Sequence, residues 1–248
     1  MVARLGVPSV KTELAIAGQV ALVTGASRGI GLAIAGRLGR MGARVAICAR
    51  NAQALERAAS ELRQQGTEAL AVPADVTHSA EVAALVERAR STLGPTDILV
   101  NNAGIGVFRP VHELAEADWD QVFDTNLKAV FLVSKAVVPE MIRRRTGHII
   151  NISSLAGKNA FARGGVYCAS KWGLLGLTYC MAEDLRAHGI RVSAICPGTV
   201  ATEFSPHAGQ DPAKMLQPED VAHAVAAVVT QAPQSFISEV LLRPTQKP

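Results

Sequence analysis

Short apolar runs alternate with helix-length amphipathic segments along almost the whole chain, and no other feature limits the fold as strongly. The apolar runs, which we expect to be strands, lie at residues 20–23, 45–48, 69–72, 98–100, 149–152, 191–195 and 239–242. The expected helices lie at about residues 30–38, 52–65, 80–93, 115–144, 165–188 and 218–230. Because strands that alternate with helices pair in parallel, the sequence predicts an α/β protein with helices on both faces of a parallel sheet.

The domain organisation follows from the length of 248 residues and from the lack of a linker rich in Pro, Gly or Ser. Residues 18–248 are expected to form a single domain, preceded by an N-terminal extension at residues 1–17. Hydrophobic residues make up 49% of the chain and aromatic ones only 4%, which suits the aliphatic core of a buried parallel sheet. Residues 199–217 are expected to form an irregular loop that closes over a site.

Composition argues against several classes of protein. The net charge is +4, and the densest basic run, residues 143–145, is expected to be the solvated end of a helix, so we expect no nucleic acid partner. No apolar run reaches about 18 residues and residues 1–14 do not resemble a signal peptide, so neither a membrane span nor export is expected. The four cysteines lack metal-ligand spacing, which predicts free thiols, no metal and a cytoplasmic location.

A glycine-rich turn at residues 24–31 joins the first expected strand to the first expected helix. Gly25, Gly29 and Gly31 allow a tight turn and a close approach of the backbone to a pyrophosphate. The free N–H groups and the dipole of the helix would then hold the anion. Such a turn is weak evidence by itself, but its place at the start of a βαβ array predicts a dinucleotide site.

The end of the second expected strand bears on which dinucleotide is bound. Sites that favour NAD place an acid there to bind the ribose 2′-hydroxyl, whereas this strand ends in Arg50 and Asn51. The Arg50 guanidinium suits a 2′-phosphate, and Arg28 could approach the same phosphate from the glycine-rich turn. We therefore expect NADP(H), although Arg50 could also be no more than a solvated strand end.

Tyr167 and Lys171 stand four residues apart at the start of an expected helix, which places them on one face. A tyrosine normally titrates near pH 10, and a nearby ammonium would lower its pKa into the range where it can exchange protons. Ser154 follows the fifth expected strand, where its hydroxyl could polarise a carbonyl oxygen. All three residues are expected at the carboxyl edge of the sheet, where open α/β sheets bind ligands.

Two further sets of residues accompany these three. Asn102, Ala103 and Gly104 follow the fourth expected strand at the same edge of the sheet. Asn126 interrupts the apolar face of the long helix expected at residues 115–144. A buried amide needs hydrogen-bond partners, so Asn126 is expected to organise a water or a neighbouring backbone segment. A satisfied core asparagine without a chemical role is the alternative.

In type, order and spacing, the residues at 24–31, 101–104, 126, 154, 167–171 and 197–198 resemble the short-chain dehydrogenase/reductase family. The resemblance spans about residue 18 to the C-terminus. It implies a single-domain, doubly wound, Rossmann-like sheet of about seven strands, usually assembled as a homotetramer. It also implies a catalytic set made of Asn126, Ser154, Tyr167 and Lys171. The residues that it implies for cofactor binding are Gly25, Ser27, Arg28, Gly29, Ile30, Gly31, Arg50, Asp75, Val76, Asn102, Ala103, Gly104, Tyr167, Lys171, Pro197, Gly198, Val200 and Thr202.

The resemblance also assigns roles. Tyr167 would donate the proton, Lys171 would depress its pKa and bind the nicotinamide ribose, and Ser154 would orient the carbonyl. Asn126 would hold a proton-relay water. Asp75 and Val76 would contact the adenine, and Asn102 the adenosine ribose. Val200 would contact the nicotinamide carboxamide, and Thr202 the cofactor near the turn that begins at Pro197. Hydride would pass from the nicotinamide to the carbonyl carbon.

Within that family the sequence is most similar to the 3-oxoacyl-[acyl-carrier-protein] reductases, which implies a small carbonyl substrate and, as a further partner, acyl carrier protein. The C-terminal residues 237–245 lack the glycine-rich end that is common in those reductases. The short 199–217 loop indicates an open pocket. Two alternatives remain: an alcohol dehydrogenase that works in the oxidative direction with NAD(P), and a non-enzymatic dinucleotide sensor. The latter class typically lacks the Tyr or the Lys that this chain keeps.

Overall fold

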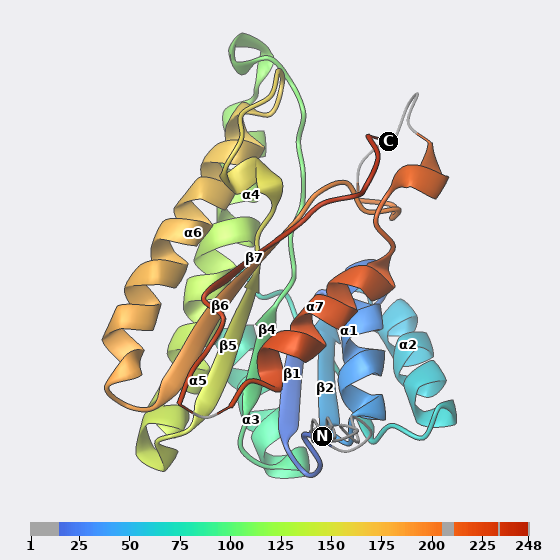
Figure 1. Ribbon diagram of the computed structural model, residues 1–248, viewed down its shortest axis with the longest axis vertical. Helices are drawn as coiled ribbons and strands as arrows, with labels where there is room; N and C mark the ends of the chain where they lie inside the picture. The colour runs from blue at the N-terminus through green and yellow to red at the C-terminus, as the bar shows by residue number, and fades with distance from the viewer. Residues whose placement is uncertain (1–14, 205–210, 233, 248) are drawn as a thin grey trace, which may run out of the picture.

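The computed structural model describes residues 15–204, 211–232 and 234–247, and it contains a seven-stranded parallel sheet in a single domain (Figure 1). The strands lie in the order β3-β2-β1-β4-β5-β6-β7. They are β1 (Val20–Thr24), β2 (Arg44–Ala49), β3 (Ala69–Pro73), β4 (Ile98–Asn101), β5 (Gly147–Ile152), β6 (Ile190–Pro197) and β7 (Glu239–Leu242). The order reverses between β1 and β4, so a crevice opens beyond their carboxyl ends. The doubly wound fold expected from the sequence is confirmed.

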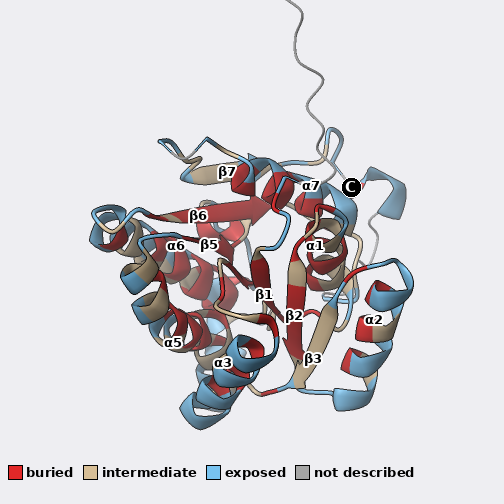
Figure 2. Ribbon diagram, turned by 90° about the horizontal axis from the view of Figure 1, so that it is seen from below, coloured by how far each residue is buried: buried red, intermediate tan, exposed pale blue. Residues whose placement is uncertain are grey.

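Helices cover both faces of the sheet, as Figure 2 shows from below. On one face lie α1 (Gly29–Arg40), α2 (Ala52–Gln64) and α7 (Pro218–Val229). On the other face lie α3 (Ser79–Leu93), α5 (Ala129–Arg144) and α6 (Gly165–Arg186). The expected strand and helix positions are therefore correct to within a few residues.

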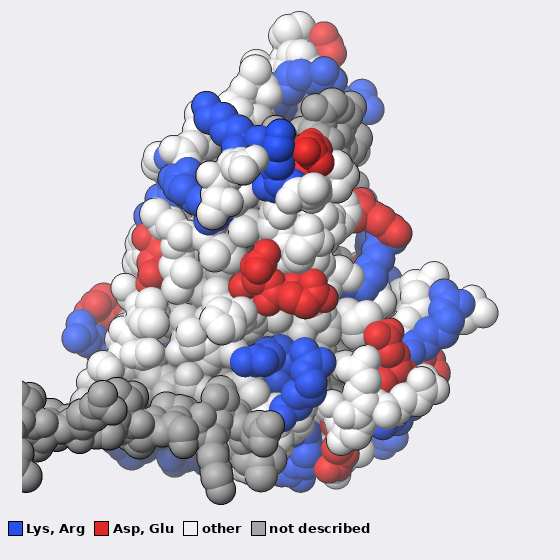
Figure 3. Space-filling model, turned by 45° about the vertical axis from the view of Figure 1, so that its right-hand side comes forward, with Lys and Arg blue, Asp and Glu red and all other residues white. Residues whose placement is uncertain are grey.

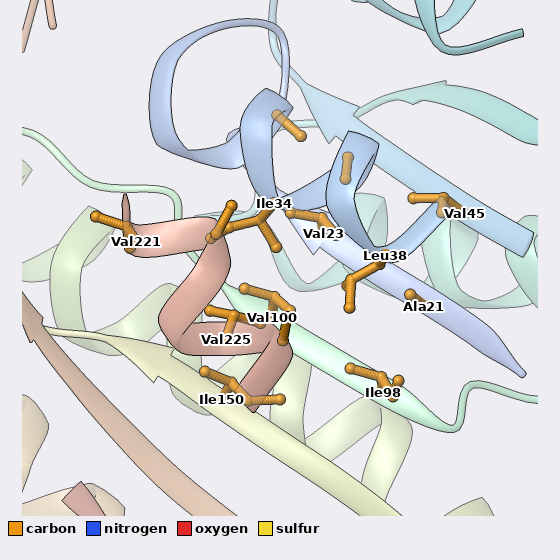
Figure 4. Close-up of a cluster of buried hydrophobic side chains, with 14 of the residues drawn as sticks. Ala21, Val23, Ile34, Leu38, Val45, Ile98, Val100, Ile150, Val221 and Val225 are labelled. Atoms are coloured by element: carbon orange, nitrogen blue, oxygen red, sulfur yellow. The ribbon is translucent and has the colours of Figure 1, made fainter. Parts of the chain in front are cut away.

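The alternation of side chains along each strand divides the core into two layers. On the α1 side, Ala21 and Val23 of β1 pack with Ile34 of α1 and Val225 of α7 (Figure 4). On the other side, Leu22 packs among residues of α3 and α5. Successive strand residues thus serve opposite layers, which is why these strands are apolar throughout rather than alternating. This core holds the carboxyl ends of the strands in place.

The long helix expected at residues 115–144 has an interruption. It consists of α4 (Glu116–Phe123), a π-helical turn at Asp124–Lys128 and α5. The π turn contains Asn126, which is fully buried. Such turns frequently occur at functional sites, because the extra residue displaces the helix locally. Hydrophobic periodicity does not report a one-residue insertion of this kind, so the sequence predicted a plain helix.

The basic run at the end of α5 is only in part a solvated helix end. The Arg144 guanidinium donates to the Asp97 carboxylate at 2.6 Å and to the Thr96 carbonyl at 2.6 Å. Asp97 in turn accepts from the N–H of Val20 at 2.8 Å. Arg144 therefore joins α5 to the starts of β1 and β4, and the expectation of a solvated residue is wrong for it.

Other expectations concern the N-terminus, the cysteines and ion or membrane binding. Residues 1–14 lie outside the described residues, whereas Ile16 of the expected extension is buried and its N–H donates to the Met41 carbonyl. All four cysteines are free, and three of them are buried. Within the described ranges no cluster of His, Cys, Asp and Glu could hold a metal ion. No helix in the same ranges is long and apolar enough to cross a membrane.

Candidate active site

A cavity of about 1260 Å³ lies at the carboxyl edge of the sheet. The glycine-rich turn and residues 102–104 line one part of it, and Ser154, Tyr167 and Lys171 line another. Pro197, the last residue of β6, and Gly198, Val200 and Thr202 after it also line the cavity. The fold thus brings most of the predicted residues to one cavity. Ser27, Arg50, Asp75, Val76 and Asn126 do not line it.

The glycine-rich turn is packed so closely at Gly25 and Gly31 that neither position has room for a side chain. A Cβ on Gly31 would lie 2.5 Å from the Gly25 carbonyl oxygen and 2.6 Å from the Asn102 amide nitrogen. Gly25 has a φ of +65°, and a Cβ there would lie 2.7 Å from the Ala103 Cα. The first turn of α1 contains no acidic residue and no side chain caps its N-terminus. This cradle therefore fits an anionic pyrophosphate, as the sequence predicted.

Asn102 and Thr24 tie the glycine-rich turn to the end of β4. The Asn102 amide nitrogen donates to the carbonyls of Thr24 at 2.9 Å and Gly25 at 3.1 Å. The Thr24 hydroxyl accepts from the N–H groups of Asn102 and Ala103. The amide nitrogen of Asn102 thus positions the turn, while the predicted contact with the adenosine ribose stays a prediction.

Arg50 and Asp75 lie beyond the ends of β2 and β3, on the side of the cradle away from Ser154. The Asp75 carboxylate accepts from the N–H and the hydroxyl of Thr77. Burial opposes ionisation of Asp75, but the Thr77 hydrogen bonds and the charge of Arg50 outweigh it and hold the pKa of this carboxyl below its usual value. Arg50 is exposed and, among the described residues, makes no hydrogen bond or ion pair, so its guanidinium is available to a phosphate.

Arg28 makes an ion pair that the sequence did not predict. Its guanidinium is paired with the carboxylate of Glu203, which follows Thr202 in the segment after β6. Both side chains are more than 70% exposed. The predicted contact of Arg28 with the 2′-phosphate stays a prediction.

Ser154 and Tyr167 meet where β5 ends and α6 begins. Ser154 caps a short 3₁₀ turn (Leu155–Gly157) by accepting from the Ala156 N–H, and its own hydroxyl reaches towards the Pro197 carbonyl at 3.5 Å. Burial raises the pKa of Tyr167 to about 12, although the Ser154 hydroxyl acts to lower it. The sequence had predicted a lowered pKa for this tyrosine. In the structure its environment keeps the phenol protonated at neutral pH.

Lys171 explains why the expected lowering does not occur. Its Nζ donates to the Ile152 carbonyl at 2.9 Å and lies 5.9 Å from the centre of the Tyr167 ring. Burial also lowers the pKa of Lys171 to about 8. A buried ammonium that is directed at the backbone and partly deprotonated near pH 8 stabilises a phenolate only weakly.

Asn126 connects the loop after β4 with α6. Its oxygen accepts from the Ile105 N–H at 2.8 Å, and its nitrogen donates to the Ile105 carbonyl at 2.9 Å and the Ser170 hydroxyl at 3.0 Å. The Ser170 hydroxyl donates to the Tyr167 carbonyl at 2.8 Å. These contacts are those of a satisfied buried amide, and they also position the backbone of Tyr167. The proton-relay water stays a prediction.

Sequence reasoning missed the residues on the far side of Ser154 and Tyr167. Phe108, Phe161 and Phe204 line the cavity there, together with Arg163 and Arg243. They come from three loops and the C-terminal segment, which carry no periodic pattern. One signal was available, because residues 155–166 join two predicted catalytic groups and must pass close to the site.

Comparisons with known proteins agree with this geometry. A family model for short chain dehydrogenase matches residues 19–213. A Staphylococcus aureus protein named as an uncharacterized oxidoreductase is 34% identical over 226 residues, which are 91% of this chain and 97% of that protein. A metagenomic short-chain oxidoreductase in complex with NADP has a TM-score of 0.83 and 47% identity, and the match covers 94% of this chain and 100% of that one.

A variant of actinorhodin polyketide ketoreductase with NADPH has a TM-score of 0.85 and 38% identity, and the match covers 91% of this chain and 95% of that one. The matched family model spans far more than half of the chain and includes the glycine-rich turn, Ser154, Tyr167 and Lys171. The family and the fold expected from the sequence are thereby confirmed. The chain belongs to the short chain dehydrogenase family of oxidoreductases.

Proposed function

We propose that this chain is an NADPH-dependent reductase of small ketones, and that 3-oxoacyl thioesters are among its substrates. The observation that carries the proposal is the pairing of Tyr167 and Ser154 in the cavity next to a cradle that fits a dinucleotide pyrophosphate. The free guanidinium of Arg50 at the end of β2, where no acid stands, supports NADPH over NADH. The likeness to the polyketide ketoreductase with NADPH supports both cofactor and substrate class.

In this proposal the residues of the chain bind and polarise the ketone. A bound nicotinamide supplies the hydride. The Ser154 hydroxyl donates a hydrogen bond to the ketone oxygen, and the Tyr167 hydroxyl transfers its proton to that oxygen. Lys171 would bind the nicotinamide ribose, and its Nζ lies 5.9 Å from the centre of the ring on which the negative charge remains. The Tyr167 phenol is protonated at neutral pH, as a proton donor to the ketone has to be.

Arg50 and Asp75 would lie around the adenosine end of the cofactor, and Val76 would pack against the adenine. Ser27, Ile30 and the backbone of residues 102–104 would enclose its phosphates and ribose. Pro197, Gly198, Val200 and Thr202 would border the nicotinamide. The assignments of Ile30, residues 102–104, Pro197, Gly198, Val200 and Thr202 rest on their place in the lining of the cavity. Those of Ser27, Arg50, Asp75 and Val76 rest on the resemblance to the family and on their place in the glycine-rich turn or beyond the ends of β2 and β3.

The proposal is tested by following NADPH oxidation with acetoacetyl thioesters, diketones, quinones and sugar ketones. We expect turnover with at least one thioester or diketone. Activity with none of these ketones, together with oxidation of alcohols by NAD⁺, would instead support the alternative dehydrogenase. Adding acyl carrier protein as the thioester carrier tests it as a partner, because a lower KM than that of the free thioester is then expected.

We also propose a homotetramer in the cytoplasm. Large exposed apolar side chains stand on the helices that cover the α5–α6 face: Trp119, Phe131, Trp172 and Tyr179. A shallow apolar groove between α5 and α6 lies among them, lined by residues that include Leu127 and Leu177. Exposed apolar area of this kind favours a two-fold contact between copies.

The three cysteines that are free and buried support a reducing compartment. Light scattering at micromolar concentration is expected to give about four times 26.0 kDa, with a dimer as the fallback. A monomer would contradict the assembly.

A further inference from the structure

The part of the cavity beyond Ser154 is lined by aromatic rings from three separate segments. The centre of the Phe108 ring lies 5.5 Å from that of Tyr167 and 6.1 Å from that of Phe161. The centre of the Phe204 ring lies 5.7 Å from that of Tyr167. Phe161 and Phe204 are 49% and 42% exposed, although Phe204 packs against the buried Tyr167 ring and Phe161 against Phe108. Exposed rings around a reactive hydroxyl favour a ligand with a flat apolar body.

The same cavity has an excess of positive charge. Its lining includes Arg28, Arg163, Arg243 and Lys247, and the acidic side chain among its lining residues, Glu203, is paired with Arg28. Within the described part of the chain, Arg163, Arg243 and Lys247 form no ion pair. Figure 3 shows blue Lys and Arg side chains on the upper part of the face that it presents. A concave wall with uncompensated cations attracts an anionic ligand.

Arg163 and Arg243 come from segments that pass close to Ser154 and Tyr167. Arg163 has a φ of +66°, a conformation that is costly for a residue with a side chain, and it donates to the Phe108 carbonyl at 3.4 Å. Arg243 follows β7 directly. A Cβ on Gly198 would lie 3.1 Å from Pro244 and 3.2 Å from Leu155, so the C-terminal segment passes beside the residue that follows Ser154. Both arginines are therefore positioned on the Ser154 side of the cavity, away from Arg50 and the glycine-rich cradle on β1 and α1.

From this arrangement we propose that the substrate is a ketone with a flat apolar body and one anionic group, a carboxylate or a phosphate. Its carbonyl contacts Ser154 and Tyr167, its body lies among the three phenylalanine rings, and its anionic group binds Arg163 and Arg243. Guanidinium groups bind both anions in bidentate fashion. This inference rests on the proposed ketone reductase activity and names the substrate class for that same site.

Matched substrates that differ in charge test the inference. 4-Acetylbenzoate is compared with its methyl ester and its amide, with NADPH at saturation. We expect kcat/KM for the carboxylate to exceed that of either neutral ketone about tenfold or more, through KM, at low ionic strength. The advantage should shrink in 0.5 M KCl, because salt screens charges at an open cavity.

A second series distinguishes phosphate from carboxylate as the anionic group. 4-Acetylphenyl phosphate is compared with 4-methoxyacetophenone, which has the same flat body without the phosphate. If a phosphate is the natural anion, kcat/KM for the phosphorylated ketone exceeds that for its neutral counterpart about tenfold or more, and the corresponding ratio for 4-acetylbenzoate is smaller. If a carboxylate is the natural anion, the order is reversed.

Variants then test whether Arg163 and Arg243 bind the anionic group of the substrate. R163Q and R243Q are each expected to reduce the ratio of anionic to neutral kcat/KM at least threefold, and the double variant to bring it to about one. R109Q is the matched control, because Arg109 follows Phe108 and is exposed but does not line the cavity, and it should keep the wild-type ratio. A wild-type ratio of one in both series, or an unchanged ratio in the double variant, overturns the inference while leaving the ketone reductase intact. Failure to reduce any ketone with NADPH overturns both.

Discussion

The ammonium of Lys171 lies 5.9 Å from the centre of the Tyr167 ring and donates to a backbone carbonyl instead of to the tyrosine hydroxyl. Tyr167 itself is buried and keeps its proton far above neutral pH. The phenol of Tyr167 lines the cavity in its protonated form, and the ammonium of Lys171 lies near its ring. This arrangement suits proton donation to a ketone, in which the negative charge on the phenol appears only after transfer.

Replacing Tyr167 with phenylalanine removes the hydroxyl assigned to proton transfer and keeps the ring that packs against Phe108. We expect the Y167F variant to lose about a hundredfold or more in kcat, because general acid catalysis contributes on that order. NADPH binding, measured by nucleotide fluorescence, should stay largely unchanged. Near-normal turnover would mean that another group supplies the proton.

Arg50 is expected to decide the cofactor preference. The wild-type protein should favour NADPH over NADH by at least about tenfold in kcat/KM, which corresponds to about 1.4 kcal/mol. Arg50→Asp replaces a phosphate ligand with an acid that suits the ribose 2′-hydroxyl, so it should abolish or reverse the preference. Steady-state kinetics with both nucleotides measures this. Equal activity of the wild type with both cofactors would refute the assignment.

Gly31→Ala should abolish dinucleotide binding or destabilise the fold, because its methyl group would lie 2.5 Å from the Gly25 carbonyl oxygen. Gly36→Ala is the matched control on the same helix, since its nearest neighbour would be the flexible end of Arg40 at 3.3 Å. Thermal unfolding with and without NADP⁺ separates the two effects. The G31A variant should lose the upward shift in Tm that NADP⁺ causes, whereas the G36A variant should keep it. A G31A protein with a normal shift would show that the cradle is looser than described.

His148 is expected to make the protein sensitive to acid. It is buried in β5, its Nε2 lies 2.9 Å from the Ser193 hydroxyl, and its Nδ1 has no hydrogen-bond partner among the described residues. Because that hydroxyl donates to the Ile237 carbonyl, Nε2 carries the proton in the neutral ring. Burial, with a further contribution from Arg191, lowers the pKa of His148 to about 3.

The sign of this effect follows from proton linkage. The unfolded chain protonates His148 near pH 6.5 and the folded chain does not, so the stability present above pH 6.5 is lost as the pH falls towards 3. Urea unfolding between pH 7 and 5 should show a slope from this residue of up to about 1.4 kcal/mol per pH unit. In the His148→Gln variant this part of the slope should vanish, whatever the loss of stability at pH 7. An identical slope in both proteins would contradict the prediction.

Local sequence pattern determined the elements of this fold and the core of its site. Each strand is a short apolar run and most helices carry an apolar stripe, so their positions were correct to within a few residues. The glycine-rich turn and the Tyr167–Lys171 spacing could be interpreted because a turn and a helix face are set by neighbours in the chain. The π turn at Asn126 could not, because one extra residue in a helix hardly alters the periodicity.

Only the tertiary structure decided the properties that depend on residues far apart in the chain. The ion pair of Arg28 with Glu203 joins positions separated by 175 residues, and the aromatic wall around Tyr167 comes from three segments. The pKa of Tyr167 was expected to fall and instead rises, because burial by the surrounding chain raises it more than the Ser154 hydroxyl lowers it. Spacing along the sequence tells which groups share a helix face. Burial, charge balance and the direction of a long side chain are set by whatever the fold packs around them, and for that reason they followed from the tertiary structure alone.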